Sequence, residues 1–138
     1  MEKGAFDYFE HEADIGIIGR GPTQAAAFES AASAMFAIMA EPATVQHQIS
    51  VQFEFEEADP EFALVTMLNR LLAEARLQRA VFSTFNVTQN GLRWKVEAYG
   101  EPWSEELERG TEVKGATLTM LSVRHLEFGW EARCVVDV

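Results

Sequence analysis

Apolar residues in the first part of the chain form a short run and then a segment with helical spacing. A short apolar run at 15–18 ends in the cluster Gly19–Pro22, which stops a strand and turns the chain. Thr23 can then serve as a helix N-cap, and beyond it apolar side chains recur at three- and four-residue spacing up to Glu41 and Pro42. This pattern predicts a strand followed by an amphipathic helix that packs on the core.

A second strand and a second helix follow in the same order. Positions 49–55 alternate strictly between apolar and polar side chains, as in a half-buried strand. Asp59, Pro60 and Glu61 then supply an N-cap, a proline at the first helical position and an acid near the positive end of a helix. Apolar residues continue at helical spacing to about Gln78.

The last sixty residues indicate strands. Asn90 and Gly91 separate two alternating segments, 81–88 and 92–99, which predicts a hairpin. A second pairing joins 113–125 to 128–136, with one apolar stripe formed by Phe128, Trp130, Ala132, Cys134 and Val136. The order strand, helix, strand, helix and then consecutive strands predicts an α+β fold with two layers: two helices on one face of a mixed, mainly antiparallel sheet.

Composition and charge narrow the functional classes. The 138 residues are 48% hydrophobic and contain no repeat or linker, so we expect a single domain over 1–138. Eleven basic against twenty-two acidic residues give a net charge of −11, which disfavours direct binding to nucleic acid or to anionic membranes. A lone cysteine, no targeting signal at residues 1–7 and no long apolar run lead us to expect a soluble cytoplasmic protein.

Enzymatic chemistry finds little support in the sequence. Cys134 lies on the predicted buried stripe, and the histidines His11, His47 and His125 share no motif spacing. The acidic stretch 54–61 is either a solvated surface or a docking site for a basic partner.

Two short segments favour metal binding. Glu10, His11, Glu12 and Asp14 place three carboxylates and an imidazole within five residues, and hard cations such as Ca²⁺ or Mg²⁺ need several oxygen ligands. A solvated loop is the alternative. The second segment is the end of the chain, where Asp137 stands next to the α-carboxylate of Val138 directly after an alternating strand, so we expect both carboxylates to have fixed positions.

Six segments match, in order, the motifs of one family. They are 10–16 (EHEADIG), 27–36 (AFESAASAMF), 67–72 (MLNRLL), 100–103 (GEPW), 110–115 (GTEVKG) and 136–138 (VDV). Together they resemble the archease family, small acidic proteins that assist the RtcB-type GTP-dependent tRNA-splicing ligase. The resemblance implies the α+β archease fold and spans nearly the whole chain.

The resemblance also implies a functional site. Its metal ligands would be Asp14, Asp137 and the terminal carboxylate of Val138, holding a divalent ion, with Ca²⁺ indicated by the family and Mg²⁺ or Mn²⁺ as alternatives. Lys114 and His11 would contact the ligase or its nucleotide, while a charge-balancing role is the alternative for Lys114.

The chain departs from the family motifs at six positions, which we expect to have altered the surface that faces the ligase. These are Glu10, Glu12, Met67, Arg70, Leu118 and Thr119. The departures leave the fold and the implied metal ligands in place.

The function implied is that of a non-enzymatic activator, which promotes metal-dependent guanylylation of the ligase and repeated turnover in RNA joining. The alternative is a chaperone-like modulator of another RNA-modifying enzyme, such as a tRNA methyltransferase. The activator needs Asp14 and Asp137, whereas an electrostatic chaperone tolerates their loss and is weakened by salt. The sequence leaves the oligomeric state open.

Overall fold

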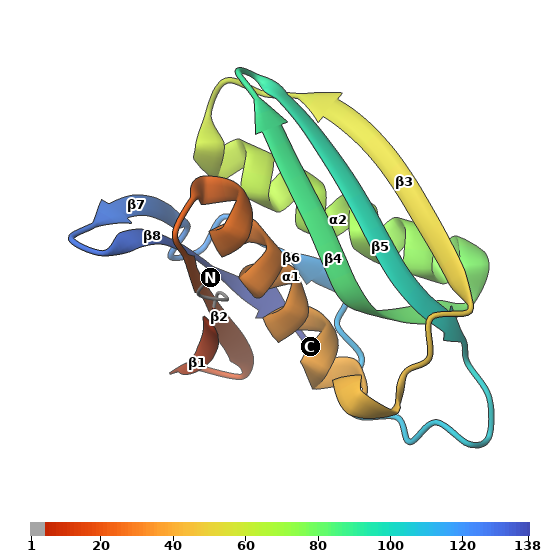
Figure 1. Cartoon of the computed structure of the whole chain (residues 1–138). Coiled ribbons are helices and arrows are strands. Elements are labelled where there is room, and N and C mark those ends of the chain that lie inside the picture. Colours follow the sequence, from red (N-terminus) through yellow and green to blue (C-terminus); the bar gives the residue numbers. More distant parts are fainter. Residues whose placement is uncertain (1–4) are drawn as a thin grey trace.

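Two antiparallel sheets and two long helices make up residues 5–138, the part of the chain that the computed structural model describes (Figure 1). Residues 1–4, part of the segment on which the expectation of no targeting signal rests, lie outside it. The elements are β1 (Ala5–His11), β2 (Asp14–Gly21), α1 (Gln24–Met39), the 3-10 turn η1 (Pro42–Thr44), β3 (Ile49–Glu56), α2 (Pro60–Gln78), β4 (Ala80–Asn90), β5 (Arg93–Pro102), β6 (Gly115–Ala116), β7 (Ser122–Leu126) and β8 (Gly129–Asp137).

The strands form two sheets. The first has the order β1-β2-β8-β6, with β7 also paired to β8, and the second has the order β3-β5-β4. Every strand pairing among residues 5–138 is antiparallel. The predicted α+β class, with two helices packed against mainly antiparallel strands, is confirmed, but the structure corrects the expected single mixed sheet. The strands divide because β8 pairs with β2 near the start of the chain instead of extending the β4–β5 hairpin.

Both helices begin where the sequence predicts. The Oγ1 of Thr23 accepts a hydrogen bond from the Ala26 amide at 3.0 Å, and the Oδ1 of Asp59 accepts one from the Glu61 amide at 2.9 Å. Pro60 is the first residue of α2, and Arg79 ends that helix in the left-handed region with φ 50°. Local capping chemistry therefore sets these boundaries.

Aromatic side chains of α1 join the helix to the second sheet. Phe28 stacks on Trp94 of β5 with ring centroids 4.6 Å apart, and Phe36 packs against Phe82 and Phe85 of β4. The same helix contacts β2 and β8 of the first sheet. Its buried positions therefore tie the two sheets together.

The β7–β8 hairpin departs from the sequence prediction. The interior of the predicted stripe is confirmed, since Ala132, Cys134 and Val136 are buried, but Phe128 is 91% exposed. Phe128 lies in the turn of this hairpin, which projects beyond the helices (Figure 1), so no helix covers it. The predicted long strand over 113–125 is also wrong: only β6 and β7 form within it.

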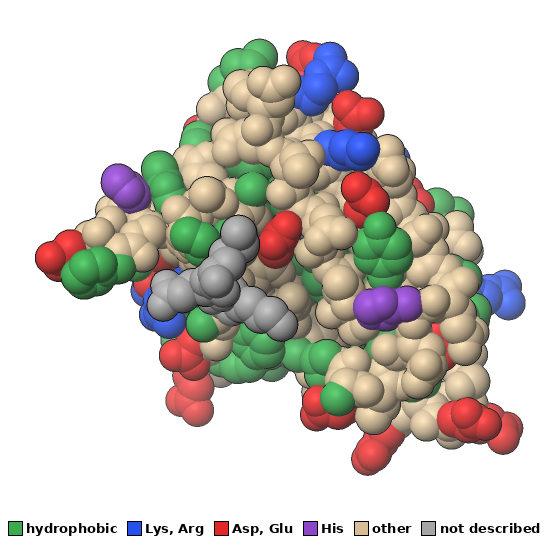
Figure 2. Space-filling view, in the orientation of Figure 1, with side chains coloured by type: hydrophobic (Ala, Val, Ile, Leu, Met, Phe, Trp, Pro, Cys, Tyr) green, Lys and Arg blue, Asp and Glu red, His purple; other side chains and the backbone are tan. Residues whose placement is uncertain are grey.

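The surface carries the excess of acidic residues. Figure 2 shows acidic side chains spread along the lower edge of one face, together with hydrophobic and acidic side chains at the tip of the projecting hairpin. Within residues 5–138 no helix is long and apolar enough to cross a membrane.

Candidate functional site

The turn between β1 and β2 lies beside the end of β8. In the β2–β8 register Ile15 pairs with Val136, so the preceding Asp14 lies opposite Asp137, and across the β1–β2 turn His11 pairs with Asp14. Directly opposed residues of antiparallel strands point to the same face. The side chains of His11, Asp14 and Asp137 therefore share the outer face of the first sheet, the face turned away from α1.

The last residue is attached to the same place. The amide of Val138 donates a hydrogen bond to Oδ1 of Asp14 at 3.3 Å, and Val138 is half-buried. This contact spans 124 residues of sequence. It brings the α-carboxylate of Val138 to the same end of the sheet as the carboxylate of Asp14.

Lys114 lies on the other side of β8. Its amide donates to the carbonyl of Asp137 at 2.8 Å, and the next residue, Gly115, pairs with Asp137 in β6. The Lys114 side chain is exposed. The main chains of the five residues that the sequence analysis assigned to the site thus lie at one end of the first sheet, with Lys114 across β8 from Asp14.

Helix α2 holds the Lys114 segment, which comprises residues 113–116, through two side chains that the sequence analysis missed. Asn69 accepts from the Ala116 amide at 2.9 Å and donates to the Ala116 carbonyl at 3.1 Å. Nη2 of Arg76 donates to the carbonyls of Val113 and Lys114 at 3.2 and 2.7 Å. Asn69 belongs to the MLNRLL segment and could have been found there, whereas no sequence signal marks Arg76.

The structure separates one of the acidic residues that the sequence places near Asp14. Glu10 pairs with Ile15, so its side chain lies on the opposite face of the sheet from Asp14. Glu12 occupies the turn with φ 55°. The four-residue cluster suggested by sequence is therefore reduced to His11 and Asp14 on the outer face.

Three of the five residues assigned to the site carry oxygen donors. Asp14, Asp137 and the terminus supply carboxylate oxygens, which Ca²⁺ and Mg²⁺ prefer. No three His, Cys, Asp or Glu side chains within residues 5–138 lie close enough together to hold a metal ion. Completing a coordination shell therefore requires the α-carboxylate of Val138, backbone oxygens or water.

Two of the six family departures lie on α2. Met67 is fully buried in the core, so the expectation that this departure alters a partner surface is wrong: a large apolar residue there fills the interior. Arg70 bonds to Glu74 at 3.2 Å and lies over the Phe53 ring. Leu118, by contrast, is 62% exposed.

A buried carboxylate lies farther along the outer face. Glu131 is 4% exposed and accepts hydrogen bonds from Arg124, Arg133 and Arg20 at 2.8, 3.0 and 3.1 Å. Burial raises the pKa of Glu131, but the three arginines outweigh it and hold the pKa below its ordinary value. Sequence patterning gave no sign of this cluster because its members come from three different strands.

The sequence profile of the Archease protein family (MTH1598/TM1083) matches residues 6–138. The chain belongs to the archease family. It is 34% identical to the Protein archease of Sulfolobus acidocaldarius, over 96% of this chain and 98% of that relative. A second archease, from Thermococcus gammatolerans, shows the same identity and coverage.

Solved structures agree with the family assignment. The solution structure of Methanobacterium thermoautotrophicum protein 1598 superposes with a TM-score of 0.86 at 30% identity, covering 97% of this chain and 99% of that one. The crystal structure of an archease from Thermotoga maritima, described as a possible chaperone, gives a TM-score of 0.67 at 18% identity, with 94% of each chain covered. The latter likeness shows the shared fold.

Proposed function

We propose that this archease is a non-enzymatic protein cofactor of an RtcB-type RNA ligase, promoting metal-dependent guanylylation of the ligase and repeated turnover. The observation that carries the proposal is the meeting of three distant segments at one end of the first sheet. The β1–β2 turn, the end of β8 and the Lys114 segment come together there, in a chain that belongs to the archease family.

Each residue of the site has a role in this proposal. Asp14, Asp137 and the Val138 carboxylate would hold the divalent ion, which when bound offsets negative charge on a phosphoryl group. The exposed Lys114 ammonium would contact a phosphate or an acidic group of the partner, with its main chain fixed by Asn69 and Arg76. His11 would contribute a further contact from the outer face.

The chemistry is assigned to the ligase. Cys134, the chain's one thiol, is buried, and burial raises its pKa to about 12, so it is not a nucleophile at neutral pH. This supports an accessory role for the chain.

The test is a guanylylation assay with purified ligase at limiting Mn²⁺ or Mg²⁺. We expect Asp14→Ala to remove most of the stimulation that the wild-type chain gives, while Glu105→Ala, which removes an exposed acid, keeps it. Full stimulation by Asp14→Ala would contradict the proposal. If that stimulation also falls steeply with added salt, the chaperone-like alternative is favoured instead.

A further inference from the structure

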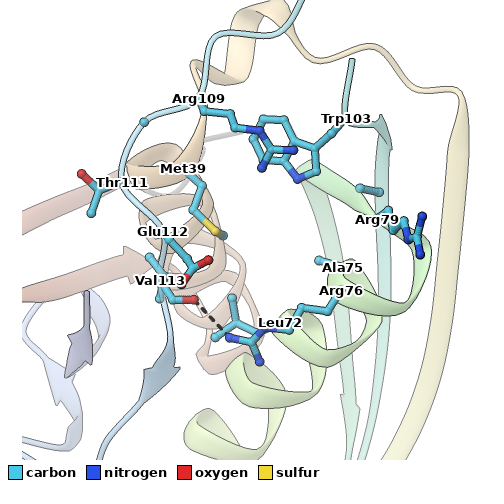
Figure 3. Close-up of a pocket in the computed structure, with 12 residues that line it drawn as sticks. Met39, Leu72, Ala75, Arg76, Arg79, Trp103, Arg109, Thr111, Glu112 and Val113 are labelled. Atoms are coloured by element: carbon cyan, nitrogen blue, oxygen red, sulfur yellow. Dashed lines mark hydrogen bonds between the residues drawn. The ribbon is translucent and has the colours of Figure 1, made fainter. Parts of the chain in front are cut away.

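A cavity of about 630 Å³ lies behind the Lys114 segment, away from the carboxylates of the proposed metal site. It opens between the ends of α1 and α2, the start of β4 and the loop 109–113 (Figure 3). Its floor is apolar and buried, formed by Leu72, Ala75, Ala80 and Val113. A volume in the range of roughly 300–1,000 Å³ with an apolar floor is typical of small-molecule sites.

The lining is strongly basic in an acidic protein. Arg76, Arg79 and Arg109 all line the cavity, which is three of the eleven basic residues of a chain whose net charge is −11. The one acidic side chain of the lining is Glu112. The local excess of guanidinium groups favours an anionic ligand, because arginine binds phosphate and carboxylate groups in bidentate geometry.

One wall of the cavity is aromatic. The guanidinium of Arg109 lies over the Trp103 ring, 4.0 Å from its centroid, and the Trp103 amide is fixed by a hydrogen bond to the Arg79 carbonyl at 2.9 Å. Figure 3 shows Arg109 and Trp103 stacked at one end of the cavity and Arg76 at the other. Aromatic rings and guanidinium planes are the surfaces on which nucleobases stack.

Arg76 keeps donors for a ligand. Its contacts with the Val113 and Lys114 carbonyls both use Nη2, and a guanidinium carries five N–H donors. The same side chain therefore lines the cavity and holds the Lys114 segment.

We propose that this cavity binds a planar aromatic anion of the nucleoside phosphate class. The base stacks at the Trp103–Arg109 wall, and the phosphate is bound by the guanidinium group of Arg76 at the other end, with Arg79 adding positive charge to the lining. The volume, the aromatic wall and the three arginines carry this inference, and it does not depend on the proposed role with the ligase.

The test is a titration of the isolated full-length protein, followed by calorimetry and tryptophan fluorescence. The probes are GTP, ATP and CTP, with guanosine and inorganic pyrophosphate as half-ligands. We expect the nucleotides to bind at least about tenfold more tightly than either half-ligand, because only they use both the stacking wall and the arginines. If pyrophosphate bound as tightly as the nucleotides, the site would attract anions in general and the proposal would be overturned. Absence of binding by every nucleotide would also overturn it.

Variants locate the binding site. Arg109→Gln and Trp103→Leu should each weaken nucleotide binding about tenfold or more, and thermal melting verifies that both fold. The matched control is Arg93→Gln, which removes an exposed arginine paired with Glu54 and Glu56 on the second sheet. Equal binding by Arg109→Gln and wild type, or an equal loss in Arg93→Gln, would overturn the assignment. Tighter binding of an acidic peptide than of any nucleotide would do the same.

Discussion

Glu131 is the residue whose neighbours differ most from what the sequence suggests. Its carboxylate is buried, yet three arginines from β2, β7 and β8 donate to it, and their own side chains keep partial access to water. The carboxylate thus organises the positive groups on the outer face of the first sheet.

Replacing the Glu131 carboxylate should lower the stability of the folded chain. We expect Glu131→Gln to lower the free energy of unfolding by about 1–3 kcal/mol, because the charged hydrogen bonds are weakened while the site stays buried. Glu54→Gln, which removes an exposed acid paired with Arg93, should cost under about 1 kcal/mol. Urea denaturation of both variants measures this difference, and equal losses would contradict it.

The same cluster gives stability a defined pH dependence. Since the pKa of Glu131 is below its ordinary value in the folded chain, the unfolded state binds its proton first as the pH falls. The stabilisation is full above about pH 4.5, the ordinary value, and is lost as the pH falls through the folded pKa. The stability difference between wild type and Glu131→Gln should therefore shrink below about pH 4.5. A difference that stays constant from pH 7 to about pH 3 would refute this assignment.

Cys134 provides a probe of unfolding. Burial raises its pKa to about 12, so the thiol is both inaccessible and protonated at neutral pH. We expect an aromatic disulfide reagent at pH 8 to modify Cys134 only in denaturant, with a midpoint that matches the loss of circular dichroism. Rapid modification of the native protein would contradict this placement.

The helices, strands and turns show which features a sequence can predict. The helix starts at Thr23 and Asp59 and the β4–β5 hairpin are set by neighbouring residues, so local patterns identified them. The division into two sheets, the position of Glu10 and the burial of Met67 depend on partners far along the chain. That Asp14, Asp137 and Lys114 belong to one site is likewise a long-range statement, and the sequence analysis could make it only through the family resemblance.

The anchoring of the Lys114 segment to α2 can be tested through Asn69. We expect Asn69→Ala to increase the hydrogen exchange rate of the Ala116 amide, because that amide loses its acceptor, and to cost about 1 kcal/mol of stability. Thr66→Ala, an exposed change on the same helix, is the matched control. Unchanged exchange at Ala116 in the Asn69 variant would show that β6 is held by its pairing with β8 alone.

For the whole molecule, a metal ion at the proposed site would connect the first hairpin to the last strand. A ligand that binds only the folded state raises stability, by about 2.7 kcal/mol at a hundred times its Kd. We therefore expect Ca²⁺, Mg²⁺ or Mn²⁺ to raise the melting temperature of the untagged protein. Asp137→Asn should remove most of this rise, because it removes a negative ligand.

A C-terminal extension tests the remaining ligand. Adding residues after Val138 turns its carboxylate into an amide. The increase in melting temperature on adding metal should therefore be smaller, as in Asp137→Asn. An N-terminal tag and Glu105→Gln should leave the rise intact. A C-terminally tagged protein with the full rise would remove Val138 from the site and leave Asp14 and Asp137 as its ligands.

The central position of β8 also bears on how the protein is made. Strand β8 lies between β2 and β6 in the first sheet and pairs with β7 as well, so β2 lacks one of its two neighbours until residues 129–137 have left the ribosome. Until then one edge of β2 lacks its partner strand and the part of α1 that contacts β8 is uncovered, while the β4–β5 hairpin can already pair with β3. The second sheet can thus form during translation, before the strands that carry the proposed site are complete.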